Sequence, residues 1–332
     1  MKCYDLLKVD PVKARLDVST VCQLRCLLCP TDENNGRAFL KSGTMPPSRF
    51  TRFLDYNPQI KWVELASSGE AFLNPDLPEI LKSAHERGVA TNLGGGVNLN
   101  DASEEALEAL VRYQTVRVRV SVDGVTEETY RRYRIGGSLG KVLTNIRKIN
   151  HFKQKYRSPF PELLLQFILF GHNEHELEKV FVLGKMLDMN VFIKLNRCPD
   201  QLPVRDREKI RNLMGYADRG EFIEAVGIQY CRDLCLGLWK APQINWDGRL
   251  LGCGSNTRMA FAEDVLDGTF LQEINNERMT YARRMLLGKA PPCDDIPCSG
   301  CAFYKQISEH KLWYTPEEIG AVASKHGVCY EP

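Results

Sequence analysis

The stretch "VCQLRCLLCP", residues 21–30, places three cysteines within eight positions. Cys22, Cys26 and Cys29 have the spacing C-x3-C-x2-C. Thiolates are soft ligands, and they suit iron–sulfur clusters, zinc and copper(I). Because a closed metal site normally takes four ligands, three protein ligands leave one coordination position for another group. The spacing therefore indicates an open metal centre, and on its own it leaves zinc and an iron–sulfur cluster as candidates.

Composition narrows the class of protein around this loop. The chain has 332 residues, 43% of them hydrophobic, and 44 basic and 42 acidic residues give it a net charge of +2. That length suits one large domain, or one domain with a smaller one. The scattered charge is unlike the basic footprint of a nucleic-acid binder. Neither a signal peptide nor an apolar run of roughly 20 residues is evident. We expect a soluble, cytoplasmic protein that binds neither nucleic acid nor membranes.

Cysteine is unusually frequent, with twelve residues in the chain. The cytosol keeps thiols reduced, so clustered cysteines there indicate metal binding or catalysis rather than disulfides. Besides the first three, the cysteines form a middle set, a late set and three isolated positions: Cys231, Cys235 and Cys253; Cys293, Cys298 and Cys301; and Cys3, Cys198 and Cys329.

The first 200 residues alternate strand-like and helix-like segments. Strands are expected at 14–21, 61–66, 89–93, 116–122, 163–169 and 190–195, and helices at 77–88, 101–113, 126–133, 139–154 and 174–188. Gly88 is expected to end the first of these helices, and Asp101 or Ser103 to cap the second. Six strand–helix units in series predict a parallel sheet with helices outside it. In such folds the chemistry lies at the carboxyl ends of the strands, where the cysteine loop follows the first strand.

The pattern changes after residue 200. We expect an N-terminal segment (1–13), the main domain (14–200), a polar linker (201–230) and a small second domain (231–332) built around metal. Within the last, "INWDGRLLGC" (residues 244–253) predicts a hairpin that turns at Asp247-Gly248. The hairpin brings together the cysteines that flank it, and a late C-x2-C pair completes four thiolates: Cys235, Cys253, Cys298 and Cys301. A structural zinc ribbon would use the same ligands.

Directly after a first strand, the C-x3-C-x2-C loop resembles that of the radical S-adenosylmethionine (radical SAM) superfamily. The resemblance extends over residues 14–200, and it implies an α/β fold, a partial (β/α)6 TIM-like barrel. It also implies that Cys22, Cys26 and Cys29 hold a 4Fe–4S cluster whose open iron chelates the amino and carboxylate groups of SAM. One electron then cleaves SAM to a 5′-deoxyadenosyl radical, which abstracts a hydrogen atom from the substrate.

Further motifs carry the resemblance into the SAM pocket. "SSGE" (residues 67–70) resembles the family's Gly-Gly-Glu motif, which contacts the SAM amino group, although Ser68 replaces the first glycine. Gly69 allows close approach of a ligand to the backbone, and Glu70 supplies a carboxylate for an ammonium group. The glycines of "TNLGGG" (residues 91–96) are expected to serve a close approach in the same way.

The segments "SVDG" and "YRRYRIGG" resemble the part of the family that binds the ribose and carboxylate of SAM. Their candidate residues are Ser121 and Arg134. Leu28 occupies the position of the usual apolar neighbour of the adenine, and Leu195, at the end of the sixth strand, is the candidate for its other face.

The later cysteines resemble the SPASM and twitch extensions of radical SAM enzymes. The pattern C-x12-G-x4-C followed by C-x2-C is most similar to the twitch form of 2-deoxy-scyllo-inosamine dehydrogenase-type enzymes, which holds one auxiliary 4Fe–4S cluster. The resemblance implies that Cys235, Cys253, Cys298 and Cys301 bind this cluster. Cys293 and Cys329 are further candidates, but they do not complete the two-cluster SPASM pattern.

Three fates of the substrate radical remain open. In the favoured reading, the enzyme is a dehydrogenase for an alcohol of a sugar- or cyclitol-like molecule, and the auxiliary cluster takes the electron. Asp123, Glu70, His172 and Arg197 are loose candidates for the base. In the second reading, an epimerase returns a hydrogen atom from a cysteine thiol.

For the epimerase, Cys198 and Cys231 are the catalytic candidates for the thiol that returns the hydrogen atom. Each of them is also compatible with a small residue buried in the core. In the third reading, the enzyme modifies a ribosomal peptide. Sulfur insertion and a non-catalytic iron–sulfur carrier also remain, but a carrier needs no SAM pocket. The resemblance further implies a flavodoxin or ferredoxin as the reductant.

Overall fold

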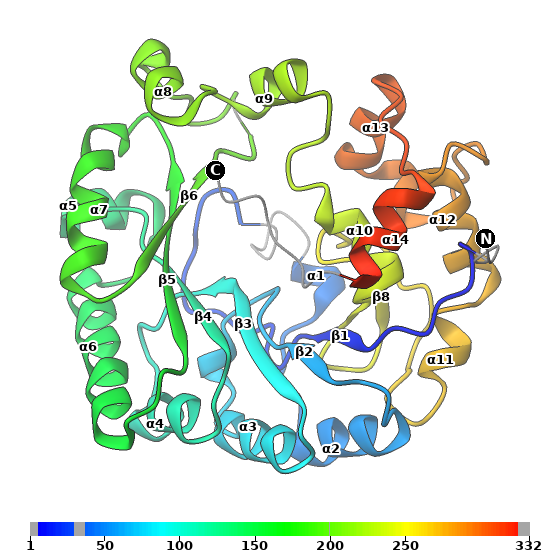
Figure 1. Cartoon of the computed structure of the whole chain (residues 1–332), viewed down its shortest axis with the longest axis horizontal. Coiled ribbons are helices and arrows are strands. Elements are labelled where there is room, and N and C mark those ends of the chain that lie inside the picture. The colour runs from blue at the N-terminus through cyan, green and yellow to red at the C-terminus, as the bar shows by residue number, and fades with distance from the viewer. Residues whose placement is uncertain (1–5, 30–36, 199, 325–332) are drawn as a thin grey trace.

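A computed structural model of the chain describes residues 6–29, 37–198 and 200–324. Its strands form one sheet in the order β6-β5-β4-β3-β2-β1-β7-β8, which curves into an open arc (Figure 1). All neighbours are parallel except β7 and β8. The strands are β1 (Lys13–Leu16), β2 (Trp62–Glu64), β3 (Ala90–Val97), β4 (Arg117–Ser121), β5 (Glu162–Leu169), β6 (Asn190–Leu195), β7 (Gln243–Ile244) and β8 (Leu250–Gly252). The expected partial barrel is confirmed, and the sheet does not close.

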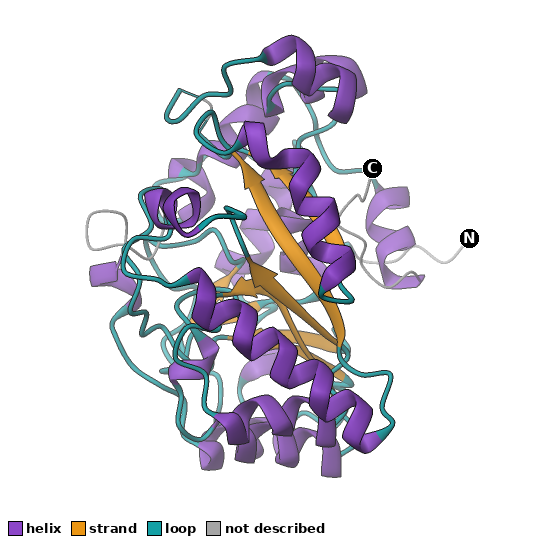
Figure 2. Ribbon diagram, turned by 90° about the vertical axis from the view of Figure 1, so that its left-hand side faces the viewer, coloured by secondary structure: helices purple, strands orange, loops and turns teal. Residues whose placement is uncertain are grey.

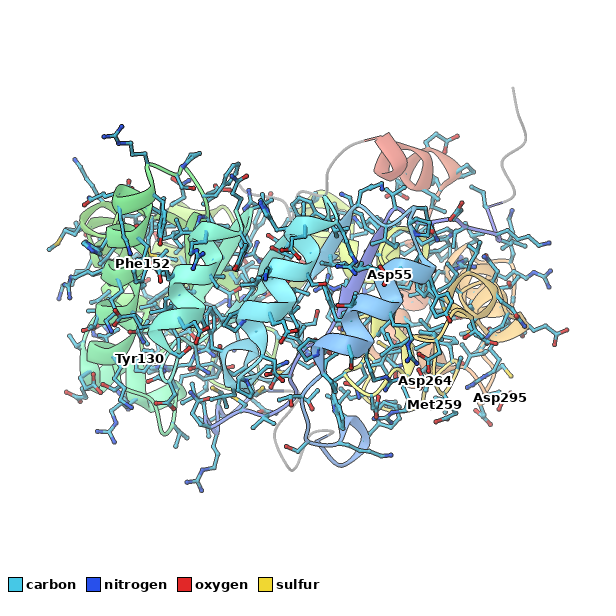
Figure 3. The ribbon with its side chains drawn as sticks, turned by 90° about the horizontal axis from the view of Figure 1, so that it is seen from below. Asp55, Tyr130, Phe152, Met259, Asp264 and Asp295 are labelled. Carbon is cyan, nitrogen blue, oxygen red and sulfur yellow. The ribbon has the colours of Figure 1, made fainter. Side chains whose placement is uncertain are left out.

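Helices cover the outer face of this arc (Figure 2). From below, α2, α3, α4 and α6 lie side by side, and Tyr130 and Phe152 lie at the opposite end of the molecule from Asp264 and Asp295 (Figure 3). The helices are α1 (Arg37–Leu40), α2 (Pro47–Tyr56), α3 (Leu77–Glu86), α4 (Glu104–Arg112), α5 (Glu127–Tyr133), α6 (Leu139–Tyr156), α7 (Leu177–Met186), α8 (Arg207–Met214), α9 (Arg219–Val226), α10 (Asp233–Lys240), α11 (Phe270–Glu273), α12 (Glu277–Leu286), α13 (Ala302–Glu309) and α14 (Pro316–Ser324), with 3-10 turns η1 (Ala71–Leu73), η2 (Glu174–Glu176) and η3 (Pro297–Gly300). Within the described ranges, none of these helices has the length and apolar character that a membrane span requires.

Most expected elements are present, with different ends. The first strand stops at Leu16 rather than at residue 21, because the chain turns there into the cysteine loop. Ser103 caps α4 by accepting a hydrogen bond from the amide of Ala106. The expected linker holds two helices, α8 and α9, which begin at the caps Asp206 and Asp218. Each aspartate accepts a backbone hydrogen bond in the first turn and so stabilises the start of its helix. The polar, proline-bearing composition of the segment does not by itself reveal these helices.

The third strand is longer than expected and runs through the glycine triplet to Val97. The pairing register with β4 shifts between Leu93 and Val97, so the strand is irregular at the glycines. The buried Glu64 carboxylate accepts hydrogen bonds from the amides of Gly94 and Gly95, at 2.8 and 3.3 Å. A Cβ atom at Gly95 would lie 1.6 Å from the carbonyl oxygen of Ala66. The triplet therefore lets β3 pack closely against β2, and Glu64 accepts the hydrogen bonds of the glycine amides.

The hairpin predicted at residues 244–253 is confirmed. Its strands β7 and β8 are antiparallel, and the amide of Gly248 donates to the carbonyl of Asn245 at 3.0 Å. Gly248 has φ +95°, a conformation that favours glycine. Strand β7 also pairs in parallel with β1. The hairpin therefore extends the main sheet and brings the later cysteines beside the strand that leads into the first cysteine loop.

Arg283 holds the C-terminal half of the chain to its N-terminal segment. Its fully buried guanidinium group donates to the carbonyls of Leu7 (2.7 Å), Leu238 (2.8 Å) and Ile274 (2.6 Å). Burial lowers the pKa of Arg283 to about 10. Three segments that are distant in the sequence thus share one donor group.

We predict that Arg283→Met lowers the free energy of unfolding by roughly 3 kcal/mol or more, because each buried carbonyl left without a donor costs about 1–3 kcal/mol. Urea unfolding followed by circular dichroism measures the change. Arg284→Met, at an exposed position on the same helix, is the matched control, and we expect it to stay within about 0.5 kcal/mol of the wild type. Equal effects of the two substitutions would contradict this role.

Candidate active site

The first cysteine loop lies at the carboxyl edge of the sheet, directly after β1. Backbone hydrogen bonds tie it to two other loops: the amide of Glu70 donates to Val21 at 2.8 Å, and that of Arg25 donates to Ile135 at 3.0 Å. Cys26 is buried, whereas Cys22 and Cys29 are partly buried. The loop packs on an apolar cluster that contains Leu24, Tyr133 and Phe170. The three thiols are therefore held together on one ordered loop.

Two polar groups donate to these sulfur atoms. The Asn98 amide approaches Cys22 Sγ at 3.9 Å, and Arg134 Nη1 approaches Cys26 Sγ at 3.6 Å. Asp123 fixes Arg134 through its Oδ2 atom, at 2.6 Å from Nε and 2.5 Å from Nη2. Burial raises the pKa of the Cys22 thiol to about 12, so these thiols ionise on binding a cationic metal group and release protons. Soft donors with hydrogen bonds to sulfur fit an iron–sulfur cluster.

Glu70 is buried beside this loop at the end of the β2 loop. Its carboxylate accepts from the amide of Asn98 at 2.6 Å and from the amide of Phe72 at 3.3 Å. Burial raises the pKa of Glu70 to about 7, although both amides act to lower it. Asn98, whose backbone amide donates to Glu70, also approaches Cys22 Sγ through its side-chain amide. The geometry therefore brings the Glu70 and cysteine predictions to one place.

The neighbouring serines and glycine are positioned by β1. Asp17 Oδ1 accepts from the amides of Ser67 and Ser68, both at 3.0 Å. Gly69 has φ +67°, and a Cβ atom there would lie 2.6 Å from the backbone of Thr20. Gly69 therefore lies close to the backbone of the chain that follows β1, at Thr20, and the expected close approach to a ligand stays a prediction. The glycine triplet of β3 likewise faces protein atoms.

The remaining SAM candidates lie around the same edge. The hydroxyl of Ser121, at the end of β4, accepts from Gln166 Nε2 at 3.2 Å. Leu28 lies in the wall of the cavity described below. Leu195 ends β6, and its side chain is buried in a cluster with Phe222 and Ile223 of α9; its contact with the adenine stays a prediction.

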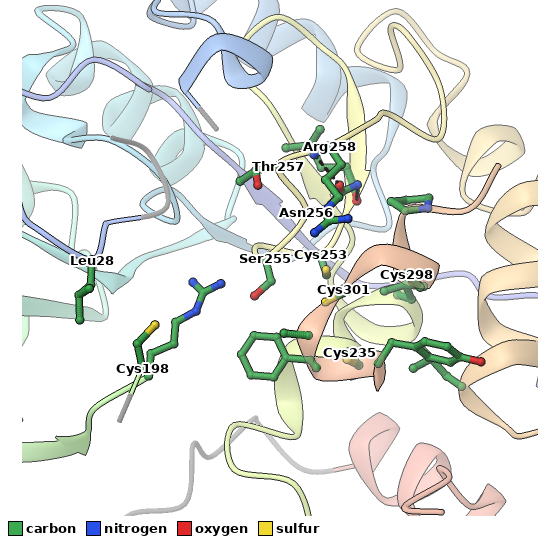
Figure 4. A pocket seen from close by; sticks show the side chains of 18 of the residues that line it. Leu28, Cys198, Cys235, Cys253, Ser255, Asn256, Thr257, Arg258, Cys298 and Cys301 are labelled. Carbon is green, nitrogen blue, oxygen red and sulfur yellow. Dashed lines mark hydrogen bonds between the residues drawn. The ribbon is translucent and has the colours of Figure 1, made fainter. Parts of the chain in front are cut away.

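The later cysteines converge on one cavity of about 310 Å³. Its wall contains Cys235, Cys253, Cys298 and Cys301 together with Leu27, Leu28, Arg197, Cys198, Gln201, Leu238, Leu251, Ser255, Asn256, Thr257, Arg258, Phe261, Leu286, Pro297, Ala302, Phe303 and Tyr304. Figure 4 shows the four cysteines gathered on one side, with Leu28 and Cys198 on the other. The cavity thus connects the first cysteine loop to the four cysteines Cys235, Cys253, Cys298 and Cys301.

Burial raises the pKa of the Cys253 thiol to about 11, and it also raises the pKa values of Cys235 and Cys298. Among the described residues, no three His, Cys, Asp or Glu side chains converge as the ligands of a single ion do. The fit of the set to a metal group therefore rests on its four soft donors, of which Cys235 is buried and the other three are partly buried.

Three further cysteines differ in position. Cys198 lies in the cavity wall, where its amide donates to Asn196 Oδ1 at 2.9 Å. Cys231 has φ +59° and precedes α10 outside the lining residues. The backbone of Cys293 exchanges hydrogen bonds with the hydroxyl of Ser299. Cys3 and Cys329, the latter an auxiliary-ligand candidate, fall outside the described residues.

The base candidates are spread over the carboxyl edge. His172 is buried and stacked on Phe170, and burial lowers its pKa. Asp123 is occupied by Arg134 and by the amide of Ile168. Arg197 lies in the cavity wall, but a guanidinium group stays protonated and cannot act as the base.

Sequence reasoning missed Asp17, Glu64 and Asn98, the polar residues that shape the site. Asp17 directly follows β1 and Glu64 ends β2, and a charged residue at the end of an apolar strand segment was the available signal. Asn98 carried no comparable signal, because its contacts with Glu70 and Cys22 depend on how the chain folds after the glycine triplet.

Comparison with known proteins agrees with the geometry of the first cysteine loop. The family model of the radical SAM superfamily matches residues 16–183, just over half of the chain. The match begins at Leu16, the last residue of β1, and includes the cysteine loop and the strands from β2 to β5.

Individual relatives cover parts of the chain. GTP 3′,8-cyclase of Listeria monocytogenes is 26% identical over 180 residues, which cover 53% of this chain and 51% of that protein. PqqA peptide cyclase of Ruegeria pomeroyi is 30% identical over 163 residues, which cover 48% and 41%. The chain thus spans about half of these relatives or less. Crystal structures of Streptococcus suis SuiB share the fold, with a TM-score of 0.64 at 11% identity over 92% of this chain and 76% of that one.

Glu70 should make stability depend on pH. Its pKa is higher in the folded chain, about 7, than the ordinary 4.5, so the folded state binds the proton more tightly. The resulting stabilisation is complete below about pH 4.5 and is lost as the pH rises through 7. We predict a loss of about 2 kcal/mol between about pH 5.5 and pH 8.

Glu70→Gln should remove this loss, as measured by urea unfolding at several pH values without SAM. Asp17, whose pKa burial raises to about 6, accounts for part of the pH dependence that remains. Glu105→Gln, at an exposed position of α4, is the control. An unchanged slope in Glu70→Gln would contradict the assignment.

Proposed function

This chain belongs to the radical SAM superfamily, and we propose that it is a dehydrogenase for an alcohol of a sugar- or cyclitol-like small molecule. Family membership implies a 4Fe–4S cluster and SAM. The bound groups would supply a 5′-deoxyadenosyl radical to take the hydrogen atom of the alcohol carbon, and an auxiliary 4Fe–4S cluster to accept the remaining electron.

One observation carries the proposal. Four thiols line a cavity whose other side is formed by Leu27 and Leu28 of the first cysteine loop. Four cysteine ligands would complete a closed cluster, which suits electron transfer rather than substrate binding. A substrate in the cavity would then lie between the two metal groups, within reach of both. We propose Cys235, Cys253, Cys298 and Cys301 as the ligands of the auxiliary cluster.

We also propose that the chain's own residues orient SAM. The Glu70 carboxylate is suited to the ammonium group of SAM, with Ser68 and Gly69 beside it on a loop that Asp17 fixes. Arg134 carries the charge suited to the carboxylate of SAM, and Asp123 holds it in place. Ser121, Leu28 and Leu195 remain candidates for the ribose and the adenine.

Epimerisation is the second candidate, because Cys198 lies in the wall of the same cavity. A thiol there can return a hydrogen atom to the opposite face of a substrate radical. Cys231 is the weaker candidate for this donor, since it is not among the lining residues. Peptide modification remains a third candidate, and the name of PqqA peptide cyclase supports it.

We predict that the anaerobically reconstituted protein holds about eight irons, and that changing Cys22, Cys26 and Cys29 together to Ala leaves about four. Cys298→Ala with Cys301→Ala should also leave about four, whereas Cys293→Ala should leave eight. Iron and sulfide analysis measures these counts. About four irons in the wild type, with zinc present, would exclude the auxiliary cluster as electron acceptor and make redox-neutral chemistry the leading reading.

The variant Cys198→Ala distinguishes oxidation from epimerisation. In an oxidation, this variant keeps turnover, whereas in an epimerisation it loses product while still forming 5′-deoxyadenosine. We predict retained turnover, measured as ketone or aldehyde formed per 5′-deoxyadenosine over a panel of sugar-like alcohols. Failure of the wild type to cleave SAM with a reductant would instead favour an iron–sulfur carrier.

A further inference from the structure

We infer that the substrate carries a carboxylate or phosphate group, which binds between Arg197 and Arg258 in the cavity that joins the two cysteine sets. The inference rests on the proposed function and adds the charge of the substrate to it. Among the described residues, the lining of the cavity includes these two arginines and no aspartate or glutamate. Its other polar side chains, among them Gln201, Ser255 and Thr257, are hydrogen-bond donors that an oxyanion can use.

The two arginines belong to opposite parts of the molecule. Arg197 directly follows β6 of the barrel, next to Cys198. Arg258 follows the hairpin, on the loop after Cys253 (Figure 4). An anionic group bound to both would bridge the barrel and the cysteine-rich half of the chain.

Both guanidinium groups keep their donors available. The Arg197 guanidinium lies over the ring of Phe303, 5.6 Å from its centroid. Such stacking fixes the plane of the group and leaves its N–H edges directed outward. Among the described residues, no ion pair or side-chain hydrogen bond occupies Arg197 or Arg258. Each planar guanidinium group can then donate two parallel hydrogen bonds to an oxyanion.

A competing explanation is that Arg258 only offsets the negative charge of an all-cysteine cluster. Arg258 Nη1 lies 1.9 Å from the position that a Cβ atom of Gly300 would take, so the guanidinium packs on the Cys298–Cys301 turn. Arg197 lies next to Cys198 on the barrel side, so the charge of the auxiliary cluster does not explain its presence in the cavity wall. The two explanations make different predictions for the binding of a small anion. If Arg258 only neutralises the charge of the cluster, the cavity has no binding site for a small anion.

The test is anaerobic titration calorimetry of the reconstituted protein with SAM bound, which occupies Arg134. Inorganic phosphate and gluconate are the probes, and they distinguish a phosphate site from a carboxylate site. We expect saturable binding of at least one probe. Arg197→Gln and Arg258→Gln should each weaken it about tenfold or more, because each removes a charge-assisted hydrogen bond.

Arg147→Gln, at an exposed position of α6, is the matched control and should bind as the wild type does. Absence of saturable binding of both probes, or binding that survives either cavity substitution, would overturn the inference. Iron counts and 5′-deoxyadenosine formation are measured on the same preparations. A missing auxiliary cluster would therefore refute the proposed oxidation separately from the anion result.

Discussion

The position of β1 between β2 and β7 is the constraint on which the whole site depends. Pairing with β2 places the cysteine loop next to the loop of Glu70, and pairing with β7 places the hairpin on the other side. Arg15 of β1 links both neighbours, since its guanidinium group donates to Ser67 and to Gln243. A four-residue strand thus sets the distance between two cysteine sets that are about 200 residues apart in the sequence.

Buried polar groups give this arrangement its rigidity. Asp17 holds the serine loop, Glu64 holds the irregular part of β3, and Asp123 holds Arg134 beside Cys26. Each carboxylate satisfies groups that a short or irregular strand leaves unpaired, and an unpaired buried group costs about 1–3 kcal/mol. The pKa values of Asp17 and Glu70 rise because burial outweighs these hydrogen bonds. The site therefore gains fixed geometry at the expense of stability near neutral pH.

Much of the fold was predictable because its signals are local. Alternating apolar segments revealed six strands and the helices between them, and Asp247-Gly248 revealed the hairpin turn. The predictions were weaker where a local pattern has two outcomes. The glycine triplet suggested a ligand contact, which stays a prediction, and the structure shows that it also packs against neighbouring strands, since glycine serves either kind of close approach. The segment before Cys231 suggested a linker, but two acidic caps start helices within it.

The first cysteine loop could be recognised as an open thiolate metal site from the sequence, because three thiols on one short loop need no distant partner to be recognised. The sequence also predicted four later cysteines as ligands of an auxiliary cluster, with Cys293 and Cys329 as further candidates. Only the tertiary structure decided that these four face the first loop across one cavity and that Cys198 and Arg197 share its wall, whereas Cys231 does not. The reason is physical: cysteine spacing along a chain fixes local geometry, but the parallel pairing of β1 with β7, between segments more than 200 residues apart, fixes what they face.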